Sequence, residues 1–479
     1  MNSNSETHIP LVVDLDGTLL KSDMLYECGM QFIRTKPLKT LSLLSWLRLG
    51  KAKFKERLAN SVDIDVSVLP YDIEVINFIS AEKKKNRKII LATATHHSLA
   101  QHISDHLDLF DHVFATTTDC NLSAHRKRDL MVETFGYKGY DYIGNSLEDI
   151  EVWGAAAKAY VVNPERGVAA KAKALGNVEN ITRSNKATLK DWLKAIRLHQ
   201  WMKNSLIFVP LLAAHQVTDL TLLAQCLLAF VFFGLCASSV YILNDLLDLS
   251  DDRHHRTKKN RPFASGKISI ASGLLLFPTL LIIALVGSAL ILPPEFSATL
   301  LFYYGLTLTY SLWLKRHMTV DVIALASLYT LRIIAGAAAL QLNLTFWLLA
   351  FSMFIFLSLA LVKRYAELND ARAKGQTSKT RGRGYYPSDL EMVSSLGAAS
   401  GYLSVMVLAL YIHDNTTTTM YSHPQIIWLA CPLLLFWISR MWMLTHRGQM
   451  NDDPVLFAAR DKVSIITGVL FGAVFWIAA

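Results

Sequence analysis

Cysteine is scarce and unpaired in this sequence. Its 479 residues include five cysteines, none in a CxxC pair or a set with histidines; they are Cys28, Cys120, Cys226, Cys236 and Cys431. This pattern argues against both a disulfide framework and a zinc site.

The amino terminus lacks the features of a secretory signal. Residues 1–10, MNSNSETHIP, contain no basic segment followed by an apolar core. A chain without such a segment is not expected to export its first domain. We therefore expect that domain to stay in the cytoplasm.

Lysine and arginine are absent from four of the stretches that separate the apolar segments in the second half of the chain. These stretches are 213–220, 291–296, 340–345 and 412–424. The alternating stretches are rich in Lys and Arg: 245–267, 315–319, 363–390 and 445–461. Positive loops of membrane proteins face the cytoplasm. The asymmetry predicts an integral inner (cytoplasmic) membrane protein whose basic loops and amino-terminal domain face the cytoplasm.

The apolar residues themselves gather after residue 200. The chain is 52% hydrophobic and carries a formal net charge of +9. A helix needs about 20 apolar residues to cross the hydrocarbon core. We expect about nine transmembrane helices in a C-terminal all-α polytopic bundle, near 204–216, 221–243, 268–292, 296–314, 320–339, 345–362, 391–412, 424–444 and 462–479.

The first part of the chain has a different pattern. Short apolar runs end in polar residues at PLVVDLDGTLL (10–20), KIILAT (88–93) and YIGNSLEDI (142–150), with helical stretches between them. This repetition predicts an α/β doubly wound domain with its ligand site at the carboxyl ends of the strands. We place this domain at 1–183, with its last turn and a linker within 166–191, and the membrane domain at 184–479.

These blocks, together with Lys127, resemble those of the haloacid dehalogenase-like phosphatases over residues 8–165. The resemblance implies that Asp14 attacks phosphorus as a nucleophile and that Asp16 acts as general acid and base. It also implies that Thr93 and Lys127 bind the phosphoryl group. Mg²⁺ would offset the repulsion between a carboxylate and a phosphate dianion. The implied metal ligands are Asp14, the Asp16 carbonyl, Asn145 and Asp149.

One position departs from that family pattern. The usual GDSxxD block is GNSLED here, so Asn145 replaces an acid and weakens the expected metal binding. A folded but catalytically impaired domain, or a mere Asp-rich turn at 14–18, are the alternatives. Residues 20–80 would form a small helical cap. Within it, LSLLSWLRLGKAKFK (41–55) is apolar and then basic, which suits either a membrane surface or the core face of a cap helix.

The sequence after the second apolar segment, NDLLDLSDDRHHRTKKNRP (244–262), combines four aspartates with five lysines and arginines. Asp245 and Asp248 are three residues apart and Asp252 is four further on, which places the three carboxylates on one face of a helix. Hard oxygen ligands so arranged suit Mg²⁺ shared with a diphosphate. A solvated charge run beside the membrane is the alternative.

The pattern NDxxDxxxD after a second span resembles that of the UbiA superfamily of intramembrane prenyltransferases, whose fold is a nine-helix bundle. Further segments resemble the branch that synthesises decaprenylphosphoryl-5-phosphoribose. They are RLHQWMKNSLIFVPL (197–211), RPFASGKIS (261–269), YSLWLKRHMTVDVIALASLYTLRIIAGA (310–337), KRYAEL (363–368) and DDPVLFAARD (452–461).

This second resemblance implies transfer of 5-phosphoribose from phosphoribosyl diphosphate to a polyprenyl phosphate, with a polyprenylphosphoryl-5-phosphoribose product. Asp245 and Asp248 are the expected catalytic metal ligands, helped by Asp252. Arg332 is singled out because a charge inside a span is costly, although it could instead pair with Asp321. The expected substrate-binding residues also include Lys203, Asn244, Lys258, Arg261, Lys315, Lys363, Arg364 and Glu367.

The superfamily's second acidic motif, DxxxD, is replaced here by KRYAELND (363–370), so the number of metal ions is left open. The segment GQTSKTRGRGYYP (375–387) has loop chemistry and would cover the donor. The expected partners are the membrane, the two phosphorylated substrates and no nucleic acid; a homo-oligomer is left open. The rival classes are a prenyltransferase acting on an aromatic acceptor and a transporter with a soluble regulatory domain, whose charges would lie nearer the midplane.

Overall fold

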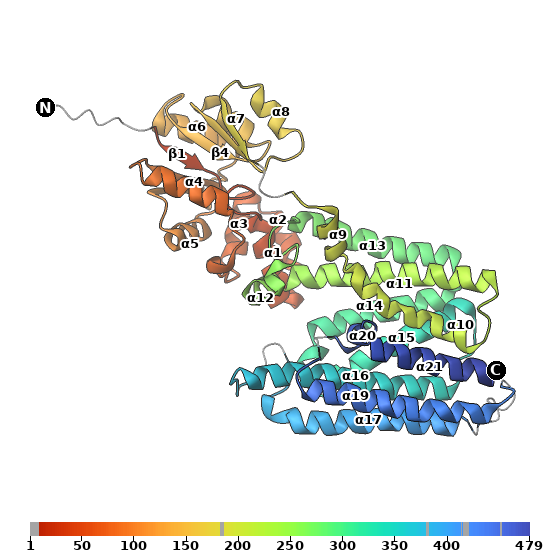
Figure 1. Ribbon diagram of the computed structural model, residues 1–479. Coiled ribbons are helices and arrows are strands. Elements are labelled where there is room, and N and C mark those ends of the chain that lie inside the picture. The colour runs from red at the N-terminus through yellow and green to blue at the C-terminus, as the bar shows by residue number, and fades with distance from the viewer. Residues whose placement is uncertain (1–8, 183–185, 380–382, 413, 415–420, 451–452) are drawn as a thin grey trace. The chain divides into compact units, whose positions relative to one another are not determined.

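The computed structural model describes residues 9–182, 186–379, 383–412, 414, 421–450 and 453–479. These residues divide into two compact units. The N-terminal unit comprises the chain up to Ile196 together with Tyr241–Phe277, and the C-terminal unit comprises Arg197–Val240 and Pro278–Ala479. The long helices α11 (Leu220–Leu247) and α13 (Ile270–Ile291) each contribute residues to both units. Figure 1 shows the elements in chain order.

A parallel six-stranded sheet forms the centre of the N-terminal unit, with strand order β3-β2-β1-β4-β5-β6. The strands are β1 (Leu11–Val13), β2 (Ile89–His96), β3 (His112–Thr116), β4 (Asp141–Gly144), β5 (Ala159–Val162) and β6 (Val178–Thr182). The chain leaves β1 toward β2 and β3 and then returns to the other side of β1 for β4. The strand order therefore reverses between β1 and β4, where doubly wound folds bind their ligands. The predicted α/β architecture is confirmed.

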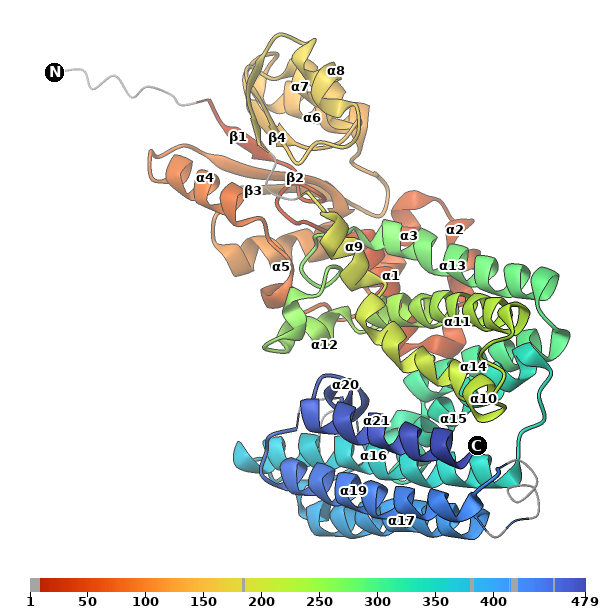
Figure 2. The ribbon, with the colours of Figure 1, turned by 45° about the vertical axis from the view of Figure 1, so that its right-hand side comes forward.

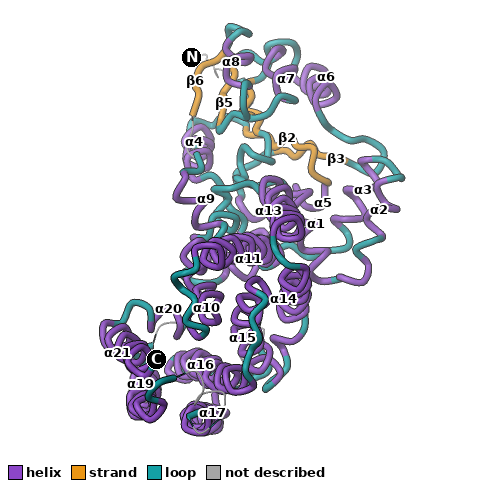
Figure 3. The backbone as a smooth tube through the Cα atoms, turned by 90° about the vertical axis from the view of Figure 1, so that its right-hand side faces the viewer, coloured by secondary structure: helices purple, strands orange, loops and turns teal. Residues whose placement is uncertain are grey.

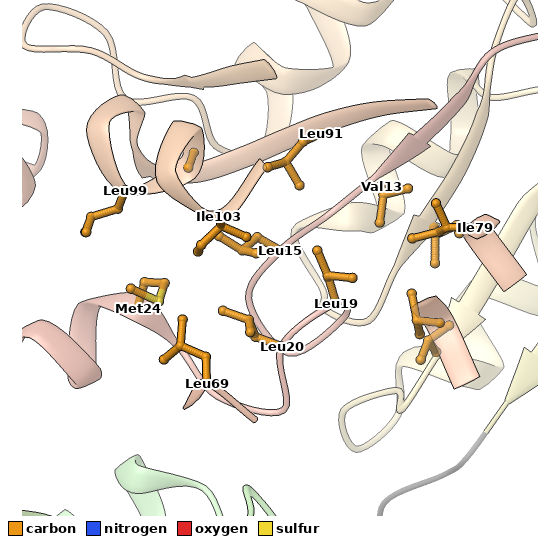
Figure 4. Close-up of a cluster of buried hydrophobic side chains, with 14 of the residues drawn as sticks. Val13, Leu15, Leu19, Leu20, Met24, Leu69, Ile79, Leu91, Leu99 and Ile103 are labelled. Atoms are coloured by element: carbon orange, nitrogen blue, oxygen red, sulfur yellow. The ribbon is translucent and has the colours of Figure 1, made fainter. Parts of the chain in front are cut away.

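Helices cover this sheet and pack on alternate strand residues. Val13 of β1 belongs to one buried cluster, with Leu15, Leu91 and Ile103, whereas Val12 belongs to another cluster. Figure 4 shows the first cluster. Successive strand side chains point to opposite faces, so each face receives its own core. The helices of this unit are α1 (Met24–Thr35), α2 (Ser42–Leu47), α3 (Lys51–Ala59), α4 (Ile73–Lys83), α5 (His97–Leu107), α6 (Ala124–Phe135), α7 (Asp149–Ala155), α8 (Val168–Lys173), α9 (Leu189–Ala195) and α12 (Leu249–His254).

The expected cap corresponds to α1, α2 and α3, which lie together in Figure 2. Asp23 caps α1 by accepting a hydrogen bond from the Leu25 amide, 2.7 Å away. The segment 166–191 is more ordered than a linker, because it includes α8, the edge strand β6 and the start of α9. The sequence does not reveal β6, because three of its five residues, VENIT, are polar.

The C-terminal unit is helical, and in Figure 3 its described part contains no strand. Its long helices run side by side, and the Arg364-bearing helix α16 packs on α15 and α17. Besides α11 and α13, the elements are η3 (Leu198–Phe208), α10 (Val209–Ala213), α14 (Pro294–Leu312), η5 (Leu314–Arg316), α15 (Val320–Leu340), α16 (Phe346–Ala373), η6 (Pro387–Asp389), α17 (Leu390–Tyr411), η7 (Pro424–Leu429), α19 (Ala430–His446), α20 (Pro454–Ala458) and α21 (Lys462–Ala478).

Six helices among the described residues are long and apolar enough to cross a membrane. They are Leu220–Leu247, Ile270–Ile291, Val320–Leu340, Phe346–Ala373, Pro387–Tyr411 and Pro424–His446. The prediction of nine spans is not confirmed, because six of the nine segments qualify as candidate spans by length and composition among the described residues. The other three segments are helical but different: 204–216 combines the end of the 3₁₀ helix η3 with the five residues of α10, α14 is less apolar, and α21 has 17 residues.

The six helices differ in how much protein surrounds them. Only 11% of the apolar window of α13 is buried, whereas 67% of that of α15 is buried. Helix α15 achieves this with small residues; a Cβ at Gly336 would collide with the Ile207 carbonyl of η3. Small residues let helices approach closely in membranes.

Candidate functional site

The carboxyl ends of β1 and β4 bring the first predicted residues together. These two strands are hydrogen-bonded neighbours, and Asp14 and Asn145 are the residues that directly follow them. Gly17 has a φ of +75°, and a Cβ there would collide with the Asn145 amide. The DxDGT turn therefore needs glycine at this position both for its backbone conformation and for the close approach of Asn145.

Lys127 joins the two carboxylates of this site. Its Nζ lies 2.7 Å from Asp14 Oδ1 and 3.7 Å from Asp149 Oδ1, and it donates to the Tyr142 hydroxyl at 2.9 Å. Burial by itself would lower the pKa of Lys127, but the charges of Asp14 and Asp149 outweigh it and raise the pKa. Burial raises the pKa of Asp14 to about 6 although Lys127 opposes the change.

Asp16 lies across the turn with different partners. It accepts hydrogen bonds from the Met24 amide at 2.8 Å and from the Thr95 hydroxyl at 2.7 Å. Burial, followed by the charges of Asp23 and Asp14, raises the pKa of Asp16 to about 7. A carboxyl group with such a pKa can both donate and accept a proton near neutral pH. The sequence did not single out Thr95.

Thr93 lies two residues before Thr95 on β2. Its side chain is fully buried, and its hydroxyl oxygen accepts a hydrogen bond from the Thr95 amide at 3.0 Å. The register of β2 against β3 shifts between Thr93 and His96. This irregularity brings both Thr93 and Thr95 to the end of the strand.

A cavity of about 760 Å³ adjoins these residues. Asp14, Asp16, Lys127 and Asn145 line it, and α3 contributes Lys55 from the cap. The Lys55 Nζ donates to the Ala94 carbonyl at 2.7 Å and to Asn121 at 3.1 Å. Burial lowers the pKa of Lys55, partly offset by Asp16 and Asp23. The lining of the cavity contains six acids and three lysines, and a phosphate ester would bind at the lysines.

The oxygen ligands available for a metal ion are limited at this site. Asp149 is 1% exposed, and its carboxylate already accepts from the Tyr142 hydroxyl and from the amides of Asn145 and Ser146. Across the described ranges, no three His, Cys, Asp or Glu side chains are grouped to hold a metal. The other hard oxygen atoms here are those of Asp14, the Asp16 carbonyl and the Asn145 amide, and the Asn145 oxygen accepts from the Thr18 hydroxyl at 3.2 Å. Because Asn145 is neutral, this set would offer Mg²⁺ one negative charge fewer than an acid at that position.

The predicted acidic motif folds at the end of α11 and the start of α12. Asp245 lies in the last turn of α11, Asp248 precedes α12, and Asp252 lies within α12. Arg261 donates from one nitrogen to Asp245 at 3.0 Å and to Asp252 at 2.6 Å. Burial raises the pKa of Asp252 to about 6, with Arg261 opposing. Asp245 and Asp252 therefore share one guanidinium, whereas Asp248 lies between the two helices and near Arg34. The prediction that the three carboxylates share one helix face is wrong, and among the described residues they are not grouped around a metal position.

Residues that the sequence did not single out form further ion pairs and hydrogen bonds beside this motif. Arg253 donates to Glu27 at 2.6 and 3.0 Å and to the Ala264 carbonyl at 2.9 Å. Asp248 lies 3.9 Å from Arg34. Among the predicted binding residues here, Asn244 is half-buried and Lys258 is exposed.

In the C-terminal unit the predicted base Arg364 is sealed inside the helices. It is 1% exposed and lies 2.8 Å from the fully buried Asp321; it also pairs with Glu367 on the next turn of α16. Asp321 accepts from the Tyr310 hydroxyl at 2.9 Å and lies 3.6 Å from Arg383. Arg364, Tyr310 and Arg383 around Asp321 explain how a carboxylate is tolerated in this position.

A second group of charges lies on the same helix and on η3. Lys203 pairs with Asp453 and lies over the Tyr329 ring, 5.8 Å from its centroid. Lys363 precedes Arg364 and, among the described residues, has no carboxylate at ion-pair distance. Lys315 is half-buried in η5. Of the late motif 452–461, Asp452 lies outside the described residues, as do residues 380–382 of the predicted covering loop.

Arg332 lies among aromatic rings. Its guanidinium carbon is 5.3 to 5.4 Å from the ring centroids of Phe233, Tyr303 and Tyr329. It donates to Asn204 Oδ1 at 3.0 Å. The alternative pairing of Arg332 with Asp321 is wrong, because Asp321 pairs with Arg364 instead.

The family model of the UbiA prenyltransferase family matches residues 205–475, more than half of the chain. The chain belongs to the UbiA prenyltransferase family. Its six candidate spans agree with a membrane-embedded family member, and the chain is an integral membrane protein. The residues of the acidic motif and of α16 both fall within the matched range.

Individual proteins are also similar to this chain. Uncharacterized protein y4nM of Sinorhizobium fredii is 35% identical over 98% of this chain and 90% of its own length. The decaprenyl-phosphate phosphoribosyltransferase of Mycobacterium tuberculosis is 31% identical over 57% of this chain and 88% of its own. Among solved structures, a UbiA homolog from Archaeoglobus fulgidus bound to DMAPP and Mg²⁺ aligns with a TM-score of 0.46 and 17% identity, over 60% of this chain and 98% of that one.

Proposed function

We propose that the UbiA part of this chain transfers 5-phosphoribose from phosphoribosyl diphosphate to a polyprenyl phosphate. The observation that carries the proposal is the base-rich sequence of α16. Lys363 lacks a carboxylate at ion-pair distance among the described residues, so its charge is available to an anion. The likeness to a decaprenyl-phosphate phosphoribosyltransferase supports the same reaction.

The acidic motif would serve the leaving diphosphate. Asp245, Asp248 and Asp252 would hold Mg²⁺, which supplies positive charge to the departing diphosphate when bound. Arg261 already lies between Asp245 and Asp252, and with Asn244 and Lys258 it would bind the same anion. The acceptor needs no strong general base, because a phosphate oxyanion is nucleophilic at neutral pH.

The bases of the C-terminal unit would bind the remaining phosphates. Lys203, Lys315, Arg332 and Lys363 are the proposed ligands. Arg364 and Glu367 would act on the substrate only indirectly, since Arg364 is held by Asp321. Charge-assisted hydrogen bonds to phosphate are about twice as strong as neutral ones, which justifies the cost of placing bases here.

We propose the orientation that the positive loops predict. η3 with α10, α14 and α21 would complete nine membrane segments in the inner membrane, with both sites on the cytoplasmic side. Residue 344 is expected outside the cytoplasm, so a fusion there should be active only with a reporter enzyme that works outside it. Residue 376 is expected in the cytoplasm, so a fusion there should be active only with a reporter that works inside it. The opposite pair of results would overturn the orientation.

The N-terminal unit would act as a haloacid dehalogenase-like phosphatase that removes the 5-phosphate from the transferase product. Asp14 would attack phosphorus, Asp16 would protonate the leaving oxygen, and Lys127 would hold the phosphoryl group. The cavity of about 760 Å³ beside these groups supports the proposal. Hydrolysis would also draw a reversible transfer forward.

The transfer is tested by incubating membranes that contain the protein with labelled phosphoribosyl diphosphate and a polyprenyl phosphate. The expected product is a lipid that carries phosphoribose, which mass spectrometry identifies. Geranyl diphosphate with 4-hydroxybenzoate is the control pair. Prenylation of the aromatic acid, with no labelled lipid, would replace the proposal by an ordinary UbiA prenyltransferase.

A further inference from the structure

The cap of the N-terminal unit displays an apolar stripe. Large hydrophobic residues at every third position point outward: Leu38 is 97% exposed, Leu41 78%, Leu44 63% and Leu47 56%. Isolated exposed leucines are ordinary, but a contiguous stripe marks an interaction surface. We call these four residues the leucine stripe.

The opposite side of the same segment is fixed to the protein. Leu43 and Trp46 pack against the buried cluster that includes Phe32, and the Phe32 and Trp46 rings lie 5.2 Å apart. The stripe is therefore displayed by an anchored segment. Its hydroxyls are also satisfied internally, since Thr40, Ser42 and Ser45 donate to local carbonyls at 2.6–2.8 Å. Contact with an apolar phase leaves no hydroxyl donor unpaired.

The charges around the stripe have one sign. Residues 36–57 include seven lysines and arginines and a single acid, Glu56. Directly after the stripe, Lys51 and Lys53 of α3 line a cleft of about 520 Å³ together with Arg126. Within the described part of the chain, none of these three bases is in an ion pair. Asp119 is the acid among the residues that line this cleft, so the cleft has an excess of positive charge beside exposed leucines.

We propose that the leucine stripe inserts into the surface of an anionic lipid bilayer and that the basic cleft binds phospholipid headgroups. Leucines at an interface gain by leaving water, while nearby lysines and arginines are attracted to anionic headgroups. The chain is an integral membrane protein, so a bilayer is always close to it. A soluble protein partner would need acidic groups to match the bases. Such a partner would itself offer hydrogen bonds to the hydroxyls beside the stripe, so their internal pairing is required by a bilayer and not by a protein.

This surface has a consequence for the phosphatase site. The α3 helix that follows the stripe also supplies Lys55 and Leu58 to the wall of the 760 Å³ cavity. Seating the cap at a bilayer would hold that wall at the depth of lipid headgroups. The cavity would then favour phosphate esters carried by a lipid over soluble ones.

Site-directed spin labelling of the full chain in nanodiscs tests the proposal. The exposed Cys120 is changed to Ser, and single labels are placed at Leu41→Cys, Leu44→Cys and the control Ile73→Cys, which is 61% exposed on α4. Bilayers containing phosphatidylglycerol should lower collisions of labels 41 and 44 with aqueous nickel reagent at least about threefold and raise those with oxygen. Label 73 should behave as in water.

The same labels distinguish the outcomes. Lys51→Glu with Arg126→Glu, or a change to neutral phosphatidylcholine, should return label 44 toward aqueous behaviour. Unchanged values would overturn the role of the basic cleft. Water-like values at 41 and 44 in anionic bilayers would overturn insertion. Protection from both reagents would show that a protein, or a second copy, covers the stripe. None of these readouts depends on turnover, so they stand apart from the proposed reactions.

Discussion

Lys127 in the N-terminal unit and Arg364 in the C-terminal unit are both buried cations held between two acids. Lys127 pairs with Asp14, which lines a large cavity. A substrate in that cavity can therefore take the place of the ammonium group beside Asp14. Arg364 is bound to Asp321, which is fully buried and lies among other donors. Each cluster contains one base between two acids, but the first adjoins an open cavity and the second is enclosed by protein.

The comparison shows that charge alone does not identify a reactive site. A buried ion pair whose members are sealed contributes to the specificity of the fold, and removing one member leaves an uncompensated charge. A pair beside open space can instead bind a ligand. Lys363, although adjacent to Arg364 in sequence, has no carboxylate at ion-pair distance among the described residues and is the better donor-binding candidate.

The largest expected effect is at the open cluster, which consists of Lys127, Asp14 and Asp149 beside the cavity. Asp14→Asn should reduce phosphate release from the phosphoribosyl lipid at least about 10³-fold, because the amide cannot attack phosphorus. Transfer should continue, so the 5-phosphorylated lipid should accumulate in extracts analysed by mass spectrometry. Asp105→Asn, an exposed carboxylate on α5, is the control. Hydrolysis by Asp14→Asn within tenfold of wild type would remove the nucleophile assignment.

The acidic motif is the second test, since its carboxylates share a guanidinium as those of the open cluster share Lys127. Asp245→Ala or Asp248→Ala should reduce phosphoribosyl transfer at least about 10²-fold, because charge stabilisation of the leaving diphosphate is lost. Chelation of magnesium should act alike. Asp251→Ala changes an adjacent, half-exposed carboxylate and should retain transfer. Near wild-type transfer by both Asp variants would make the metal assignment untenable.

The sealed cluster, which consists of Arg364, Asp321 and Glu367, is tested by Arg364→Ala. Removing the guanidinium leaves Asp321 buried without its closest ion-pair partner, which should lower the free energy of unfolding by about 3–5 kcal/mol. Thermal melting of the detergent-solubilised chain measures this loss. If the variant melts like wild type and only binds the donor less tightly, Arg364 belongs with the open sites and the contrast fails.

Lys363→Ala should have the smallest effect and the opposite character. The melting temperature should be unchanged, while KM for phosphoribosyl diphosphate should rise about tenfold, equivalent to the loss of one modest charged contact. KM for the polyprenyl phosphate should change less. Lys374→Ala, at the exposed end of α16, is the control. Equal effects on both substrates would show that Lys363 does not discriminate the donor.

Much of the N-terminal fold follows from the sequence. Apolar runs that end in Asp14, Thr93 and Asn145 predict both the strands and the edge at which they meet, because parallel strands place their carboxyl ends together. Thr95 and Tyr142 could not be foreseen as partners of Asp16 and Lys127. Their contacts depend on a register shift in β2 and on packing across the sheet.

The C-terminal unit was less predictable in detail. Hydropathy locates its long helices, but it does not reveal that Leu198–Phe208 forms a 3₁₀ helix. The sequence also gave no reason to prefer Arg364 over Arg332 as the partner of Asp321. That choice depends on which faces of α15 and α16 meet, which no single-sequence pattern specifies.

The unequal enclosure of α13 and α15 should be visible in how the two helices accept mutation. In a deep mutational scan, α13 should accept exchanges among Leu, Ile, Val and Phe at most positions, since lipid requires only hydrophobicity there. In α15 the tolerated set should narrow to small residues, with Gly336 excluding every side chain because the Ile207 carbonyl fills the space. Homologous sequences should therefore drift quickly along one helix and slowly along the other.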